Sequence, residues 1–193
     1  REDLKLVIGD ITMPVEVEDK IDYIIHCASI TTSKIMISRP VDVIRTSLNG
    51  TENLLEIAKE KQVRSMVYVS SMEMYGVLNL QDDQMVTEEM TGYLNPLALR
   101  SNYPESKRMC ENMCVAYGTQ YEVPVKIARL AQTFGAGVLP GENRVFAQFA
   151  RSAMKGSDIV LHTEGKSEGN YCYTADAVRA LLTILVKGEN MQA

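Results

Sequence analysis

Apolar residues follow two patterns along this chain. Short continuous runs rich in β-branched residues indicate buried strands, and longer segments with recurring apolar positions indicate helices. The predicted strands are residues 4–8, 22–29, 67–71, 125–130 and 158–162, and the predicted helices are residues 41–61, 103–119 and 142–155. The polar stretch 79–92 shows no apolar period and is predicted to be a loop.

Tyr103 and Lys107 open the second predicted helix with a spacing of four residues. Four residues are just over one helical turn, so the two side chains share a face. A free phenol has a pKa near ~10, and an ammonium held beside it favours the phenolate. The pair therefore predicts a proton acceptor for an alcohol, although the same spacing also occurs in ordinary solvated helices.

The predicted strand 67–71 ends in Ser70 and Ser71 and is followed by a loop that contains Gly76. This pattern is typical of the carboxyl end of a parallel strand, where open α/β sheets bind ligands. Ser71 could then hydrogen-bond a substrate hydroxyl while Tyr103 acts as the base. The segment VYVSSMEMYG, followed by Y-x-x-x-K, resembles the extended short-chain dehydrogenase/reductases, specifically the NAD-dependent sugar-nucleotide epimerases and dehydratases.

Further segments resemble motifs of this family, in the same order along the chain. They are GDI at 9–11, DYIIHCAS at 22–29, GTENLL at 50–55 and TFGAG at 133–137. Two positions depart from the family pattern. Ser47 stands where an asparagine is usual, which affects a polar network and its proton relay, and Gly169 stands where an arginine commonly contacts the substrate diphosphate.

The resemblance implies an α/β, Rossmann-like, doubly wound parallel sheet. The family's G-x-x-G-x-x-G loop, which would hold a pyrophosphate at a helix N-terminus, is not found in this sequence. We therefore expect an N-terminally truncated fold in which the first βαβ unit is missing and the strand at 4–8 has no native neighbour. Residues 1–135 would form an incomplete dinucleotide-binding domain, and residues 136–193 part of a small substrate-binding region interleaved with it.

The resemblance also implies the residues of the site. The catalytic group would be Ser71, Glu73, Tyr103 and Lys107. The cofactor, NAD with NADP as an alternative, would contact Asp10, Ile11, Cys27, Ala28, Ser29, Ser70, Tyr103, Lys107 and Leu130. The nucleotide-sugar substrate would contact Ser71, Gln132 and Arg144. Lys107 would keep Tyr103 ionised and reach the nicotinamide ribose.

The implied reaction begins with oxidation of a sugar hydroxyl carbon, usually C4, by hydride transfer to NAD. An epimerase is the first interpretation. A decarboxylase, a dehydratase or a simple keto-reductase of the same family are the alternatives. Met72 occupies the place of the aspartate of 4,6-dehydratases, while Glu73 resembles the glutamate of sugar-nucleotide decarboxylases and of many epimerases. A catalytically inert folding or assembly unit, which binds NAD weakly, is a further alternative.

Composition agrees with a cytoplasmic enzyme. The chain has 193 residues and a net charge of −5, and it lacks a basic cluster, which argues against nucleic acid or anionic membrane as a partner. No apolar run approaches the ~20 residues that span a bilayer. The four cysteines lack metal-binding spacing, so no metal is expected. A homodimer is predicted through the helices 41–61 and 103–119, with an apolar face formed by Met109, Cys110, Met113 and Tyr117.

Overall fold

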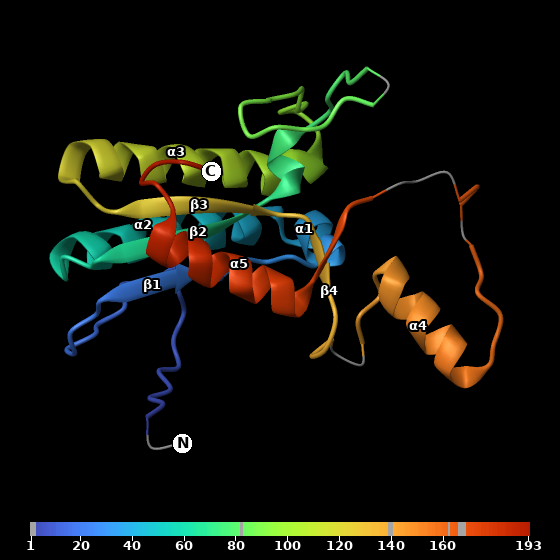
Figure 1. Cartoon of the computed structure of the whole chain (residues 1–193), viewed down its shortest axis with the longest axis horizontal. Coiled ribbons are helices and arrows are strands. Elements are labelled where there is room, and N and C mark those ends of the chain that lie inside the picture. The colour runs from blue at the N-terminus through green and yellow to red at the C-terminus, as the bar shows by residue number, and fades with distance from the viewer. Residues whose placement is uncertain (1–2, 82, 139–140, 162, 166–168) are drawn as a thin grey trace. The chain divides into compact units, whose positions relative to one another are not determined.

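The computed structural model describes residues 3–81, 83–138, 141–161, 163–165 and 169–193. The chain divides into two compact units. The first consists of residues 1–129 together with 181–193, and the second of residues 130–180. Figure 1 labels the elements of both, and each unit is treated by itself below.

A three-stranded sheet forms the centre of the first unit. Its strands are β1 (Tyr23–His26), β2 (Ser65–Ser71) and β3 (Val125–Leu130), in the order β1-β2-β3. β1 runs parallel to β2, with Tyr23 opposite Ser65 and His26 opposite Tyr68. The predicted strands at 67–71 and 125–130 are therefore confirmed, and the one predicted at 22–29 is confirmed for Tyr23–His26, because residues 27–29 lie outside the strand.

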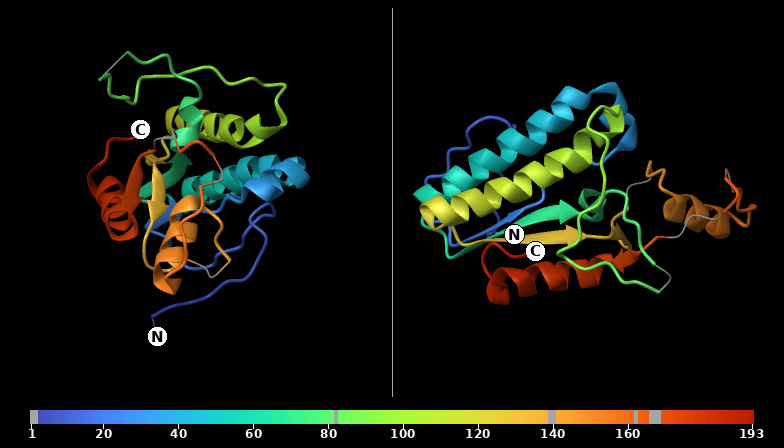
Figure 2. Two further views of the ribbon diagram at one scale, coloured as in Figure 1. Left: turned by 90° about the vertical axis from the view of Figure 1, so that its right-hand side faces the viewer. Right: turned by 90° about the horizontal axis from the view of Figure 1, so that it is seen from above.

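Two long helices lie side by side on one face of this sheet, as both views in Figure 2 show. α2 (Pro40–Glu60) follows the short α1 (Ser33–Ser38), and α3 (Asn102–Tyr121) precedes β3. Pro40 suits the first position of α2, where the backbone N–H would have no partner within the helix. The core between helices and sheet contains Leu55, Met66, Cys110, Cys114 and Val125, all fully buried.

The end of the chain covers the opposite face and one edge of the sheet. α5 (Thr174–Lys187) contributes its last two turns to the first unit, where the Ser65 hydroxyl donates to the Leu185 carbonyl at 2.7 Å. Beyond it, the Met191 N–H donates to the Val125 carbonyl at 2.7 Å. The buried ammonium of Lys126 links Ser65 to Asn190, at 2.8 and 2.9 Å.

The second unit contains a two-stranded parallel sheet and a helix. β4 (Gln132–Phe134) pairs with β5 (Tyr171–Tyr173), and Gln132 lies opposite Tyr171. α4 (Val145–Lys155) ends at Gly156, whose φ of +63° is a left-handed conformation that favours glycine. Aromatic side chains join these elements through tilted and edge-on contacts among Phe134, Phe146, Tyr171 and Tyr173.

Two predicted strands are wrong. Residues 4–8 are not in a strand, and Leu4, Leu6 and Ile8 are 75, 80 and 90% exposed. Residues 158–161 are likewise irregular and exposed, and residue 162 lies outside the described residues. An apolar run becomes a strand only where a neighbouring edge accepts its backbone hydrogen bonds, which composition alone does not reveal.

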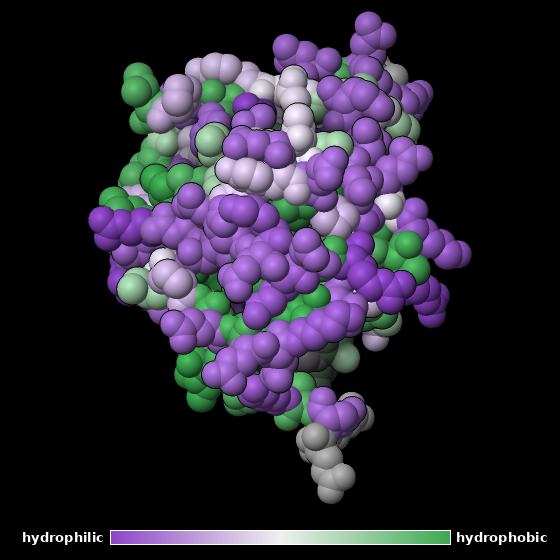
Figure 3. All heavy atoms as spheres, turned by 90° about the vertical axis from the view of Figure 1, so that its left-hand side faces the viewer, coloured by the Kyte–Doolittle hydropathy of each residue, from purple (hydrophilic) through white to green (hydrophobic). Residues whose placement is uncertain are grey.

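The surface toward the left-hand side of Figure 1 is mostly hydrophilic. Figure 3 shows polar side chains over most of this face, with apolar atoms in smaller patches between them. Within the described part of the chain, no helix is long and apolar enough to cross a membrane.

Candidate functional site

The carboxyl ends of β1 and β2 lie at the same edge of the sheet because the two strands are parallel. β1 leads into Cys27, Ala28 and Ser29, and β2 ends at Ser71. Ser71 caps the 3-10 helix η1 (Met72–Tyr75), and its hydroxyl accepts a hydrogen bond from the Glu73 N–H at 3.2 Å. The sequence-predicted serines and Glu73 are thereby gathered at one edge.

The first turns of α3 bring Tyr103 and Lys107 to this edge. Both side chains are buried, with 6 and 3% of their surface exposed. The Lys107 ammonium donates to the carbonyl of Val69 in β2 at 2.8 Å. It also lies 4.8 Å from the centre of the Tyr68 ring and 5.7 Å from that of Tyr103. One lysine therefore fastens the helix to the strand and sets a cation beside the phenol.

Burial has the largest effect on the electrostatics of Tyr103. Burial raises the pKa of Tyr103, hydrogen bonding to the Ser71 hydroxyl lowers it, and the nearby Glu73 charge raises it. The net direction is upward, and the role of Lys107 in keeping Tyr103 ionised stays a prediction. Burial also lowers the pKa of Lys107, to about 8.

Arg100 is a site residue that the sequence did not indicate. It lies in η2 (Leu99–Ser101), immediately before α3. Its Nη2 donates to both carboxylate oxygens of Glu73, at 2.9 and 3.2 Å. Its guanidinium carbon is 5.9 Å from the centre of the Tyr103 ring. Arg100 and Glu73 are 27 residues apart, so their contact leaves no signature in the local sequence.

A second arginine holds the loop that follows η1. Arg108 donates to the carbonyls of Met74 and Gly92, both at 2.7 Å. Val77 and Tyr93 pair as an antiparallel bridge, which joins the two ends of this loop. The predicted loop at 79–92 is thus confirmed for its described residues, and residue 82 lies outside them.

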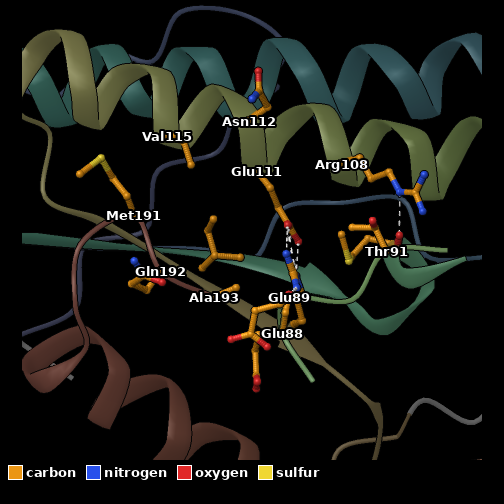
Figure 4. Close-up of a pocket in the computed structure, with 13 residues that line it drawn as sticks. Glu88, Glu89, Thr91, Arg108, Glu111, Asn112, Val115, Met191, Gln192 and Ala193 are labelled. Atoms are coloured by element: carbon orange, nitrogen blue, oxygen red, sulfur yellow. Dashed lines mark hydrogen bonds and ion pairs between the residues drawn. The ribbon is translucent and has the colours of Figure 1, made fainter. Parts of the chain in front are cut away.

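One helical turn beyond Lys107 in α3, Glu111 forms a buried polar network. Its carboxylate accepts from the Ser70 hydroxyl at 2.5 Å and from both Nε and Nη2 of Arg129, the latter at 2.7 Å. Arg129 also donates to the Glu88 carbonyl at 2.6 Å and lies 5.1 Å from the centre of the Tyr75 ring. Figure 4 shows Glu111 pointing from α3 into a pocket of about 610 Å³ that Glu88 and Glu89 also line.

Ile11 is anchored to α2, and Asp10 is held within its own turn. The Asp10 carboxylate accepts from the N–H and hydroxyl of Thr12, and these hydrogen bonds lower the pKa of Asp10. Asn53 donates to the Ile11 carbonyl at 2.8 Å. An added Cβ at Gly50 would lie 3.1 Å from the Ile11 side chain, so the glycine permits this close approach.

The donor set at the sheet edge fits a dinucleotide cofactor. The Ser29 hydroxyl is buried and has no hydrogen-bond partner in the described part of the chain. The small residues Cys27 and Ala28 precede it, and desolvation raises the pKa of the Cys27 thiol, which keeps that group neutral. An unpartnered buried hydroxyl among small residues leaves room and a hydrogen-bonding atom for a ligand.

Three predicted residues belong to the second unit and remain predictions. Leu130 and Gln132 are half-buried around the start of β4. The Arg144 guanidinium is bonded to Glu142 at 2.7 Å and lies 4.9 Å from the Phe146 ring. Within the described part of the chain, no group of three or more histidine, cysteine, aspartate or glutamate residues could hold a metal ion.

The model of the NAD dependent epimerase/dehydratase family matches residues 1–193. The chain belongs to this family. UDP-glucuronic acid decarboxylase 1 of Xenopus tropicalis is 30% identical over 184 residues, which are 95% of this chain and 42% of that protein. UDP-glucuronic acid decarboxylase 6 of Arabidopsis thaliana is 31% identical over 184 residues, which are 94% of this chain and 51% of that protein. The chain thus spans about half the length of the curated relatives it matches.

Solved structures confirm the predicted Rossmann-like α/β fold. The epimerase Mth375 of Methanothermobacter thermautotrophicus matches with a TM-score of 0.83 at 23% identity, over 100% of this chain and 57% of that one. The dTDP-glucose 4,6-dehydratase DesIV of Streptomyces venezuelae, with NAD and TYD bound, matches with a TM-score of 0.76 at 24% identity. The match covers 95% of this chain and 55% of that one. At this identity the likeness establishes the fold, and family membership rests on the family model.

Proposed function

We propose that the protein carrying this chain oxidises a hydroxyl carbon of a nucleotide-sugar with NAD as the hydride acceptor. The observation that carries the proposal is the convergence of Ser71, Tyr103 and Lys107 at the carboxyl edge of the sheet. Family membership supports the cofactor, and the relatives, which are UDP-glucuronic acid decarboxylases, support the substrate class.

The residues would divide the work as follows. Ser71 would hydrogen-bond the reacting oxygen, and the Tyr103 oxygen would receive its proton. Asp10, Ile11, Ala28 and Ser29 would hold the cofactor, whose nicotinamide takes up the hydride. Because burial raises the pKa of Tyr103, the phenolate needs added positive charge or a higher pH to form. We therefore expect the oxidation rate to increase with pH through the pKa of Tyr103.

Decarboxylation and epimerisation are two outcomes of this first step. A 4-keto-uronic acid carries its carboxylate β to the new ketone and can lose CO2, whereas a neutral 4-keto-sugar can be reduced on its other face. The curated relatives named above are decarboxylases, which favours the first outcome. Met72 in place of an aspartate argues against 4,6-dehydration.

The test uses the full-length protein with NAD and either UDP-glucuronic acid or UDP-glucose. Release of CO2 would identify a decarboxylase, and a 4-epimer would identify an epimerase. Tyr103→Phe should lower turnover by about 10² or more because it removes the general base. Turnover of Tyr103→Phe within twofold of the unmutated enzyme would refute the proposed mechanism. Titration of this 193-residue chain with NAD tests the alternative of an inert folding unit.

We further propose a homodimer in which α2 meets its symmetry mate. A groove of about 810 Å³ lies along α2 and the start of α3, and its lining includes the exposed side chains Val41, Leu97, Leu99 and Met109. The predicted apolar face needs a correction. Cys110 is fully buried, and Met113 and Tyr117 pack against the core, so only Met109 of those four side chains is exposed.

A further inference from the structure

The exposed ion pair between Arg100 and Glu73 does not by itself explain the position of Arg100. Its Nη2 bridges both oxygens of Glu73, while its buried Nη1 has no hydrogen-bond partner. The side chains of Arg100 and Glu73 are each 39% exposed, and an ion pair of that exposure contributes only about 0–1 kcal/mol. A buried donor left without a partner costs stability, so its retention needs a reason other than folding.

The two ends of Arg100 face different members of the site. Its Nη2 donates to the Glu73 carboxylate, and its guanidinium carbon lies 5.9 Å from the centre of the Tyr103 ring. Glu73 follows Ser71 by two residues, and the Ser71 hydroxyl accepts the Glu73 N–H. Arg100 is thus the contact through which η2 fixes the carboxylate that lies beside the phenol.

We propose that Arg100 is a positioning residue, which holds the Glu73 carboxylate in place and offsets its negative charge at Tyr103. This inference rests on the proposed function, because it assigns Arg100 a task in proton transfer at Tyr103. Arg100 itself need not touch the substrate. Its effect is transmitted through Glu73 and through the charge it places next to the phenol.

Helices α1 and α2 pack on Tyr103 with the apolar side chains of Met36 and Val43, and the other elements around it contribute polar or charged groups. These groups are Ser29 after β1, Tyr68 in β2, Ser71 and Glu73 at η1, Arg100 in η2 and Lys107 in α3. Glu73 raises the pKa of Tyr103 and Arg100 lowers it. Loss of Arg100 would remove the positive charge that lowers the pKa of Tyr103. It would also leave the negative charge of Glu73 uncompensated, so both effects would raise the pKa of Tyr103.

The experiment measures kcat and kcat/KM against pH for the full-length enzyme and its Arg100→Met and Arg100→Lys variants. We expect Arg100→Met to move the limb that rises with pH upward by about one unit, which lowers activity about tenfold below that limb. Arg100→Lys restores a charge without the planar guanidinium. It should return the limb toward its original pH while kcat stays reduced.

Arg64→Met is the matched control, because Arg64 is exposed and precedes the amino end of β2. Its profile should coincide with that of the unmutated enzyme. The inference would be overturned if the profile of Arg100→Met coincided with that of the unmutated enzyme in both pH and kcat. If Arg100→Met does not fold, the profile of Arg100→Lys is judged by the same criterion. Tyr103→Phe separates the two claims. If that variant is inactive and the Arg100 profiles are unchanged, only the role of Arg100 fails; if it is fully active, the proposed function fails as well.

Discussion

Replacing Glu111 by alanine probes the network that ties α3 to β2 and β3. The side chains of Glu111 and Arg129 are only 8 and 12% exposed, and Glu111 also accepts from the Ser70 hydroxyl. Removing one partner of a buried ion pair costs about 3–5 kcal/mol, because the other charge stays buried and uncompensated. Arg129 keeps its hydrogen bond to the Glu88 carbonyl, so we expect the lower end, about 3 kcal/mol.

For a chain of this size a loss of about 3 kcal/mol corresponds to a decrease of about 6–12 °C in Tm. The assay is urea and thermal unfolding of the purified protein, followed by circular dichroism. Glu111→Ala/Arg129→Met should recover about 2 kcal/mol relative to the sum of the single losses, since no charge is then left unpaired. Glu60→Ala, at an exposed glutamate of α2, should change stability by less than about 0.5 kcal/mol.

A loss of less than about 1 kcal/mol for Glu111→Ala would refute this reasoning. It would mean that water enters the pocket shown in Figure 4 and solvates Arg129. Additive losses in the double variant would have the same meaning, because they would show that the two side chains do not depend on each other.

Two further predictions concern pH and assembly. Burial lowers the pKa of His26 to about 4, below the unfolded value near ~6.5, so the unfolded chain binds the proton more tightly. Stability should be complete above about pH 6.5 and decrease by about 3 kcal/mol as the pH falls to about 4, and His26→Asn should flatten this slope in urea titrations at several pH values. Leu97→Glu places a charge on a side chain that is 94% exposed in the α2 groove and should convert a dimer to monomers in sedimentation velocity; an unmutated protein that is already monomeric at micromolar concentration would contradict the dimer.

The sequence alone determined the features that depend on near neighbours along the chain. Tyr103 and Lys107 share a helix face because four residues separate them, whatever surrounds the helix. Ser71 ends a strand because the apolar run before it ends there. His26 lies within the apolar run 22–29, and it is 1% exposed. These local patterns, taken in order, were sufficient to indicate the family.

Tertiary structure alone decided the pairings and the energetics. Arg100 meets Glu73 across 27 residues, and Ser70 meets Glu111 across 41, and neither pair leaves a periodic trace in the sequence. Residues 4–8 and 158–161 have strand-like composition without strand structure, because no neighbouring edge pairs with them. The direction of the pKa shift of Tyr103 depended on burial, which the spacing to Lys107 could not reveal. Spacing fixes which side chains can be neighbours on one element, whereas desolvation and long-range contacts arise only when the elements pack together.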